Sequence, residues 1–473
     1  MSKLPVVAVV GLTLIGLVLS APSASAEHPE SIFYNSQIVT MEEGVPTAEA
    51  IAIRGGLIVA IGTNEAILAL QGPDTRVVDL GARTVLPGFI DSHAHWIFDR
   101  NISGIASAPT ETGRRWVPYW ETGDMSAGSA TAQEAVQAAL KGGWTSISEL
   151  FVDQERLDEL LALDEAGELR IRVNAYLPLS FEFQRFGDWY QVYTQGEELS
   201  PRVRIGGVKI FSDNGDNYGQ GDIIPAFSGP DVFFTQEELT ALVAQAHTAG
   251  FQIAIHAMAD AGLDLVLNAY EDALQGESNS VYRHRVEHLA LVRDDQLDRM
   301  ARLGLIASIP LTWFDSHPWY TWDVRHYFGL ERADLVARWR DILAAGIPSI
   351  GGTDYPWFYG DGSATTTVSR AVTRIGEPGQ PPADWMLDQR ITVEQALRLL
   401  TIDAAYGTFQ EDVKGSIAVG KFADLVVLSA NPLTVPPDEI KDIEVLLTMV
   451  NGRVEYCAPI SFFSSPVSFA ACL

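Results

Sequence analysis

The sequence has little positive charge for its length. Of its 473 residues, 32 are lysine or arginine and 61 are aspartate or glutamate, which gives a formal net charge of -29 at pH 7. Binding to nucleic acid or to an anionic membrane surface needs a basic footprint, so the composition argues against both kinds of partner. A strongly negative net charge instead favours a highly soluble protein.

Cysteine is nearly absent. The two cysteines, Cys457 and Cys472, lie near the C-terminus and have no histidine or acidic residue beside them. This placement argues against a cysteine-based catalytic site. In an oxidising compartment we expect the two residues to form a disulfide that closes a short loop and ties down the terminus. Two free thiols are the alternative.

Long hydrophobic runs are absent after the first residues. Lys3 precedes an almost wholly apolar segment, residues 4–19, and Ala24-Ser25-Ala26 has the small-x-small pattern of a cleavage site. The run is shorter than the roughly 20 residues that span a bilayer. We therefore expect residues 1–26 to be a signal peptide cleaved after Ala26, which predicts an exported protein, periplasmic or secreted, with no membrane association after cleavage.

Short strand patterns occur at both ends of the chain. They are SIFYNSQIVTM, EAIAIRGGLIVAIG and TRVVDL near the N-terminus, and ADLVVLSANP and IEVLLTMVNGRVEY near the C-terminus. Gly55-Gly56 and Asn451-Gly452 predict tight hairpin turns, because these residue types readily adopt positive φ. We expect one small composite β-sandwich domain from residues 27–86 and 415–458, followed by a C-terminal tail over 459–473.

Strands alternate with helices in the rest of the chain, and no internal repeat is visible. Helical patterns occupy residues 129–143, 235–250 and 293–304, and residues 392–405 predict a closing helix. The candidate strands are residues 88–95, 145–150, 171–177, 203–211, 251–257, 284–289, 305–310 and 348–354. Eight strands with intervening helices predict an α/β fold, a (β/α)₈ TIM-like barrel over residues 87–414.

Polar residues lie at the carboxyl ends of these strands, where barrel enzymes place their sites. The candidates are His93, His95, Lys209, His256, His288 and Asp354. A single His-x-His pair is more often incidental than metal-binding, but the joint placement favours a metal site. Lys209 lies among apolar neighbours, where an unpaired ammonium is costly to bury. It needs an anionic partner or a chemical change, such as reaction with carbon dioxide to give a carbamate.

Several motifs resemble those of the amidohydrolase superfamily, and within it the amidohydrolase-3 or YtcJ-like branch of metal-dependent hydrolases. They occur in family order from about residue 30 to residue 456: PGFIDSHAHW, VKIFSDNG, IAIHAMAD, RVEHLALV, LGLIASIP, GGTDYPW and GSIAVGKFADLVVLSANPL. The resemblance implies two divalent metal ions, with zinc the default for a nitrogen-rich site. It implies these ligands: His93, His95 and Asp354 for one ion, His256 and His288 for the other, and the carbamate of Lys209 bridging both.

The resemblance also implies a reaction. A water activated by the metal ions would attack a small-molecule substrate, and Asp354 would act as the catalytic residue that moves its proton to the leaving nitrogen. The expected function is hydrolysis of a non-peptide amide or related C–N bond. An esterase or lactonase, a deaminase, and a non-catalytic regulatory or binding protein that retains metal are the alternatives. Relatives often form dimers or larger assemblies, so a homo-oligomer is one option, and the sequence leaves the oligomeric state open.

Aromatic loop residues after the strands suggest a substrate with an apolar or planar part. The candidate substrate-binding residues are Trp96, Trp313, His317 and Trp357. Asp91 and Glu287 neighbour the ligands and are candidates for supporting them.

Overall fold

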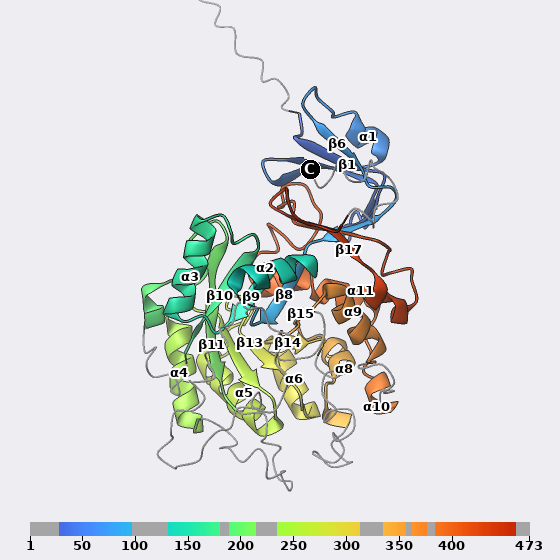
Figure 1. The fold of residues 1–473 in the computed structure, drawn as a ribbon. Coiled ribbons are helices and arrows are strands. Elements are labelled where there is room, and N and C mark those ends of the chain that lie inside the picture. Colours follow the sequence, from blue (N-terminus) through green and yellow to red (C-terminus); the bar gives the residue numbers. More distant parts are fainter. Residues whose placement is uncertain are drawn as a thin grey trace, which may run out of the picture.

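Strands of this chain form three sheets, of four, six and eight strands. The structure, a computed structural model, describes residues 28–96, 131–179, 189–213, 234–312, 334–355, 362–375 and 384–459. In Figure 1 the largest sheet and its surrounding helices form the lower body, and the two smaller sheets lie above it.

The eight-stranded sheet is parallel, and each strand pairs with the next along the chain. Its strands are β8 (Phe89–Ala94), β9 (Trp144–Leu150), β10 (Arg172–Pro178), β11 (Val203–Phe211), β12 (Ile253–Ala257), β13 (Arg285–His288), β14 (Ile306–Pro310) and β15 (Ser349–Gly352). All eight predicted strands are confirmed. The bounds of β11 are as predicted, and the other bounds differ from the predicted ones by one or two residues at most.

The barrel closes where β15 meets β8. Near the carboxyl ends of these strands, the Asp354 N–H donates to the His93 carbonyl oxygen at 2.7 Å, and the His95 N–H donates to that of Tyr355 at 2.7 Å. Gly352 makes the close approach possible, because a Cβ at this position would lie 2.6 Å from the His93 nitrogen. The backbone contacts that close the barrel therefore involve His93, His95 and Asp354 directly.

Replacing Gly352 by alanine is expected to lower the melting temperature, because β8 and β15 would have to move apart. Overpacking of this kind costs about 1–3 kcal/mol of unfolding free energy, which thermal unfolding measures. Gly44→Ala is the matched control, since a Cβ there would meet nothing within 4 Å. Equal melting temperatures for the two variants would contradict this account of the closure.

Helices cover the outside of the barrel (Figure 1). They are α2 (Ala132–Lys141), α3 (Gln154–Glu165), α4 (Gln236–Thr248), α5 (Asp260–Leu274), α6 (Asp294–Leu303), α8 (Trp339–Ala344), α9 (Ala364–Thr373), α10 (Asp384–Leu387), α11 (Val393–Leu399) and α12 (Ile402–Gly407). Threonine caps α2, α4 and α11 through a reciprocal capping box, with Glu134 for Thr131, Glu238 for Thr235 and Gln395 for Thr392, which satisfies backbone N–H groups that have no partner within the helix.

The prediction of a single closing helix over 392–405 is wrong, because the chain forms two helices there, α11 and α12. The break falls at Leu400 and Thr401. The Leu400 carbonyl accepts the Ile90 N–H of β8 at 2.8 Å, and the Thr401 hydroxyl donates to the Leu397 carbonyl at 2.6 Å. These bonds replace the continuing helical pattern and tie the segment to the barrel.

The two smaller sheets combine strands from both ends of the chain. Their strands are β1 (Ser31–Tyr34), β2 (Gln37–Val39), β3 (Thr47–Ala48), β4 (Ala50–Arg54), β5 (Leu57–Gly62), β6 (Arg76–Asp79), β7 (Thr84–Pro87), β16 (Leu425–Leu428), β17 (Val445–Val450) and β18 (Arg453–Cys457), with the short helix α1 (Asn64–Leu68). In the six-stranded sheet, the C-terminal β16 pairs with the N-terminal β7. The predicted α/β barrel with added sheets from both chain ends is therefore confirmed.

The two predicted hairpin turns are present and lie against each other. One joins β4 to β5 through Gly55-Gly56, and the other joins β17 to β18 through Asn451-Gly452. A Cβ on Gly56 would lie 2.6 Å from Oδ1 of Asn451, and the Ala423 N–H donates to the Gly56 carbonyl at 2.8 Å. The N-terminal and C-terminal hairpins therefore meet tip to tip.

The composite sheets are joined to the barrel by polar contacts. Arg172, at the start of β10, forms an ion pair with Asp424 at 2.7 Å, and Arg202 forms one with Glu455 at 3.1 Å. Cys457 ends β18 and is disulfide-bonded, whereas Cys472 lies outside the described residues.

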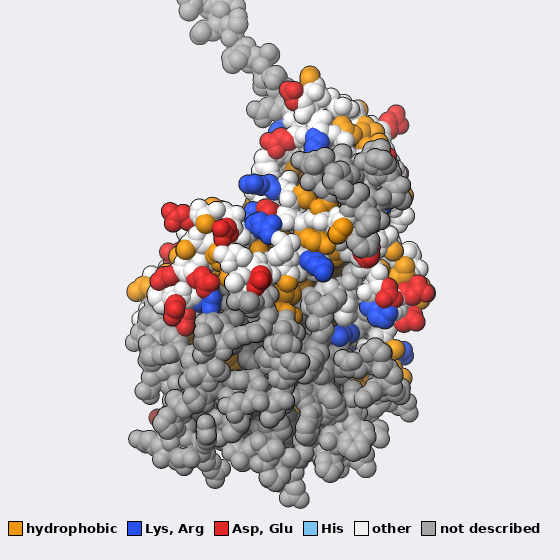
Figure 2. All heavy atoms as spheres, viewed as in Figure 1, with side chains coloured by type: hydrophobic (Ala, Val, Ile, Leu, Met, Phe, Trp, Pro, Cys, Tyr) orange, Lys and Arg blue, Asp and Glu red, His pale blue; other side chains and the backbone are white. Residues whose placement is uncertain are grey.

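The surface of the described residues carries charge of both signs. On the face drawn in Figure 2, acidic and basic side chains are intermixed over the described part. Among the described helices, none has the length and apolar character needed to cross a membrane.

Candidate metal centre

The six predicted metal-binding residues all lie at the carboxyl ends of barrel strands. His93 is on β8 and His95 directly follows it, while the other four belong to strands across the barrel: Lys209 on β11, His256 on β12, His288 at the end of β13 and Asp354 just after β15. The backbone turns sharply at two of these positions, with φ of 76° at His288 and 54° at Asp354. Left-handed backbone at a non-glycine residue is uncommon and occurs often at functional sites.

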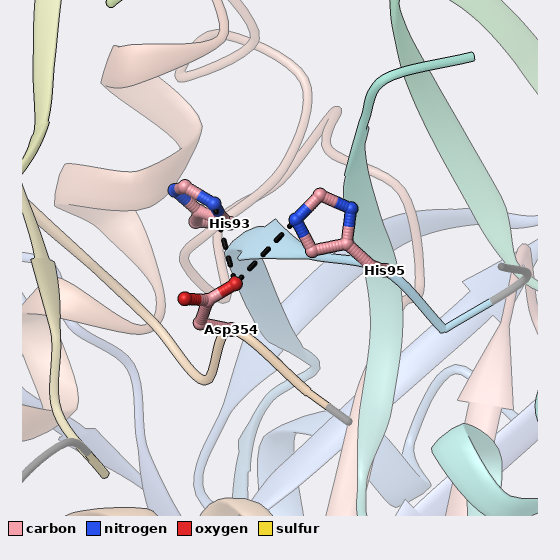
Figure 3. Close-up of side chains that lie close together, drawn as sticks. All are labelled: His93, His95 and Asp354. Carbon is pink, nitrogen blue, oxygen red and sulfur yellow. Dashed lines mark ion pairs between the residues drawn. The ribbon is translucent and has the colours of Figure 1, made fainter. Parts of the chain in front are cut away.

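His93, His95 and Asp354 form a cluster of metal-sized dimensions. One ligand atom from each side chain lies within 4.8 Å of the other two, and all three residues are buried. Figure 3 shows both imidazole rings directed toward the Asp354 carboxylate. The Nε2 atoms of His93 and His95 each lie 3.4 Å from Oδ1 of Asp354. This arrangement of nitrogen and oxygen donors suits a divalent transition metal.

His288 and His256 extend this cluster across the barrel. Nδ1 of His288 lies 3.6 Å from Oδ2 of Asp354, and its ring centroid is 4.6 Å from that of His93 and 4.4 Å from that of His256. Nε2 of His256 lies 3.3 Å from Oδ1 of Asp213. The structure therefore brings all four predicted histidines into one continuous group, with the two Asp354 oxygens facing different members.

The histidines are in the state that metal binding requires. Burial, as the largest cause, lowers the pKa of all four, and for His95 the value falls to about 3. Neutral imidazole is the form that offers a lone pair to a metal ion. Burial also raises the pKa of Asp354 well above its usual value. The group as a whole thus avoids holding several like charges in a dry interior.

Lys209 is fully buried beside this group. Among the residues that the structure describes, its Nζ has no hydrogen-bond partner, and it lies 4.8 Å from the centroid of the Phe211 ring. Burial lowers its pKa to about 8, although the charges of Glu287 and Asp354 oppose this change. A buried amine of this kind fits conversion to a carbamate better than it fits a permanent ammonium.

Asp91 supports the closure of the barrel. Its carboxylate accepts hydrogen bonds from the Thr353 hydroxyl at 2.6 Å, the Thr353 N–H at 2.9 Å and Nε1 of Trp96 at 3.0 Å. These bonds join β8 to the segment that carries Asp354. Burial raises the pKa of Asp91 to about 6, although the bonds from Thr353 and Trp96 oppose that rise.

Trp96 was predicted to contact substrate, and the structure places it in a packed position. Its side chain is only 4% exposed, and its ring stacks on Tyr355 with a centroid distance of 4.0 Å. A contact between Trp96 and substrate stays a prediction. The other three candidates, Trp313, His317 and Trp357, lie outside the described residues.

An aromatic pair that the sequence did not single out lies next to His256. The ring centroids of Phe151 and Phe211 are 5.8 Å apart, and that of Phe211 is 5.2 Å from the His256 ring. Phe151 has φ of 97°, a strained value for a residue with a side chain. This pair places an apolar surface beside the predicted ligands.

Two further residues of the site were missed at the sequence level. Asp213 faces His256, and its carboxylate also accepts the Met258 N–H at 3.1 Å. Arg285 forms a buried ion pair with Glu287 at 2.5 Å. Both lie inside the motifs VKIFSDNG and RVEHLALV. Asp213 faces a histidine of another strand, and Arg285, besides Glu287 on its own strand, contacts Ser92 and Ser308 of other strands, so no local pattern marks them.

Comparison with known proteins identifies the family and agrees with this fold. Residues 121–456 match the model of the amidohydrolase family. The chain is 24% identical to an N-substituted formamide deformylase from Arthrobacter pascens, over 89% of this chain and 97% of the relative. It is 28% identical to the putative amidohydrolase YtcJ of Bacillus subtilis, over 56% of this chain and 50% of that protein.

A solved structure shares the fold. An uncharacterised metal-dependent hydrolase from Pyrococcus horikoshii superposes with a TM-score of 0.68 at 22% identity, covering 86% of this chain and 99% of the other. The chain therefore belongs to the amidohydrolase family, in its YtcJ-like branch, and is a metal-dependent hydrolase.

Proposed function

We propose that this protein is an exported amidohydrolase that cleaves a non-peptide amide or related C–N bond of a small molecule. The observation that carries the proposal is the convergence of His93, His95 and Asp354 on one point at the barrel mouth. Export is supported by the apolar segment over residues 4–19 and the Ala24-Ser25-Ala26 pattern that follows it. The relative from Arthrobacter pascens, an N-substituted formamide deformylase, supports the bond type.

The residues present fit two divalent ions, with zinc as the proposed metal. In this proposal His93, His95 and Asp354 would hold the first ion and His256 and His288 the second, and Lys209, as its carbamate, would serve both. When bound, divalent ions lower the pKa of a water molecule and offset the negative charge that develops on the substrate oxygen.

Asp354 is proposed as the proton carrier. Its Oδ1 faces the Nε2 atoms of His93 and His95, so we assign Oδ1 to metal binding. Its Oδ2 lies toward His288 and is assigned to proton transfer. This oxygen would take the proton of the attacking water and deliver it to the leaving nitrogen. Because an amine leaves readily only with a proton, a carrier at this position favours an amide over an ester.

The aromatic pair beside His256 indicates part of the substrate. Phe151 and Phe211 offer an apolar face next to the site, and apolar lining with a few polar groups is typical of small-molecule sites. We therefore propose a substrate whose acyl or amine part is apolar or planar.

Metal content and a substrate panel test this proposal together. We expect close to two transition-metal ions per chain by elemental analysis, and hydrolysis of formamides, N-acyl amino acids or cyclic amides in preference to aryl esters. Cleavage of esters alone would favour the esterase alternative, and release of ammonia would favour a deaminase. Protein that binds no metal under any loading condition would contradict the proposal.

A further inference from the structure

Arg285 lies close to the candidate metal centre, and its guanidinium bonds to groups on three barrel strands. Its side chain is fully buried on β13. Nε and Nη2 donate to the two oxygens of Glu287 at 2.5 and 2.7 Å. Nη2 also lies 2.7 Å from the Ser92 carbonyl oxygen and 2.9 Å from the Ser308 hydroxyl. One guanidinium thus connects β8, β13 and β14.

Glu287 links this guanidinium to His93. Its Oε2 lies 2.6 Å from Nδ1 of His93, and both side chains are buried. A carboxylate held by a guanidinium fork acts only as an acceptor, so Nδ1 of His93 carries the hydrogen of this bond. The lone pair is then on Nε2, the atom that faces Asp354 at 3.4 Å. The ion pair therefore selects the tautomer that can bind a metal ion.

The second contact of Arg285 fixes the backbone at the same residue. Ser92 directly precedes His93, and its carbonyl oxygen accepts from Nη2 of Arg285. His93 is therefore held at its ring, through Glu287, and at its backbone, through Ser92. An ion pair that served only to stabilise the fold would need neither the bond from Glu287 to His93 nor the bond from Arg285 to Ser92.

The barrel interior is built to hold Arg285 in this place. The Tyr176 hydroxyl lies 3.2 Å from Nη1 of Arg285 and donates to Gln252 at 2.5 Å. Space for the Tyr176 ring comes from Gly206 on β11, where a Cβ would lie 2.6 Å from Cε2 of the ring.

We infer that Arg285 is a positioning residue for the metal centre: through Glu287 and Ser92 it sets the tautomer and the orientation of His93. This inference rests on the proposed role of His93 as a ligand. Outer partners of ligating histidines commonly change metal affinity by about 10–100-fold, and the two-point attachment places Arg285 in that class although it touches no ligand side chain directly.

Metal affinity of the full-length protein tests the inference without reference to turnover. The metal-free protein is titrated with Co²⁺, whose visible spectrum reports ligand geometry, and with Zn²⁺ in competition with a chelator. For Arg285→Met and Glu287→Gln we expect dissociation constants raised by about 10–100-fold and an altered cobalt spectrum. Arg285→Lys retains the charge but lacks the forked guanidinium, so we expect its metal affinity to be lowered as well. If Arg285→Met does not fold, the metal affinity of Arg285→Lys tests the inference instead.

Two further variants make the outcome specific. Arg374→Met removes another buried guanidinium, one that packs on Trp339, and is expected to lower the melting temperature while leaving metal affinity unchanged. His93→Ala tests the ligand assignment itself. If His93→Ala loses metal while the Arg285 and Glu287 variants bind cobalt as the wild type does, the inference is overturned and the proposed function stands. If His93→Ala binds metal normally, the proposed ligand set fails.

Discussion

Asp354→Asn is expected to lower kcat by about 10²–10⁴-fold, the usual contribution of a positioned proton carrier, while bound metal is retained. Asparagine has the same size and keeps a carbonyl oxygen that can face His93 and His95, both of which lie 3.4 Å from Oδ1. It cannot accept a proton and pass it on. Steady-state rates, with metal content measured on the same samples, check this expectation.

Asp424→Asn is the matched control for this variant. Asp424 is a buried aspartate bonded to Arg172, at the junction of β10 and the composite sheets. Its replacement is expected to reduce the melting temperature and leave kcat unchanged for folded protein. Full activity of Asp354→Asn would contradict the proposed proton transfer. Loss of both metal and activity would support only a metal-binding role for Asp354.

Lys209→Met is expected to abolish activity and to lower the metal content below that of the wild type. If Lys209 is the proposed anionic ligand, its loss removes about 4 kcal/mol of transition-state stabilisation, or roughly a thousandfold in rate. Methionine fills a similar apolar volume, so the fold is expected to persist. Because the Nζ of Lys209 has no hydrogen-bond partner among the described residues, its removal leaves no described polar group without its bond.

Chemical rescue and a second buried lysine sharpen this test. A short carboxylic acid such as acetate is expected to restore part of the activity of Lys209→Met, because its carboxylate can occupy the place of the proposed carbamate. Lys414→Met is the control. Lys414 is equally buried but donates to the Ser146 hydroxyl at 2.6 Å, near the start of β9, and its replacement should leave metal content unchanged. One ion per chain, with no added CO₂ mass on Lys209, would favour the deaminase alternative.

The barrel could be predicted from the sequence because its strands are short apolar runs with abrupt ends. β11 is an example, since VRIGGVKIF is bounded by polar residues and its predicted limits agree with the structure. The break between α11 and α12 could not be predicted. It depends on the Leu400 carbonyl bonding to Ile90, and those residues lie far apart in the sequence while the local pattern continues to favour a helix.

Some residues of the candidate site could likewise be predicted from the sequence, and others could not. His93 and His95 could be predicted to lie together because alternate residues on a strand share a face. Lys209, His256, His288 and Asp354 joined them because the carboxyl ends of barrel strands meet at one face, and the family motifs supplied only their assignment to metal ions. Arg285 could not be predicted, because its meaning depends on Ser92, Tyr176 and Ser308, which only the closed barrel brings together. Trp96 is a different case. An aromatic residue beside a ligand suggests substrate contact, and the structure adds a role that the sequence did not indicate, because its Nε1 is bonded to Asp91.

The meeting of the two hairpin tips, Gly55-Gly56 and Asn451-Gly452, has a consequence for how the chain assembles in time. The strands before residue 88 emerge from the ribosome long before their partners β16 and β17. At about 5–20 residues per second, the wait is on the order of half a minute. During that interval β7 has an unpaired edge, which is open to association with other chains. The composite sheets therefore cannot be completed before β16 and β17 are synthesised, so the N-terminal strands depend on partners from the other end of the chain.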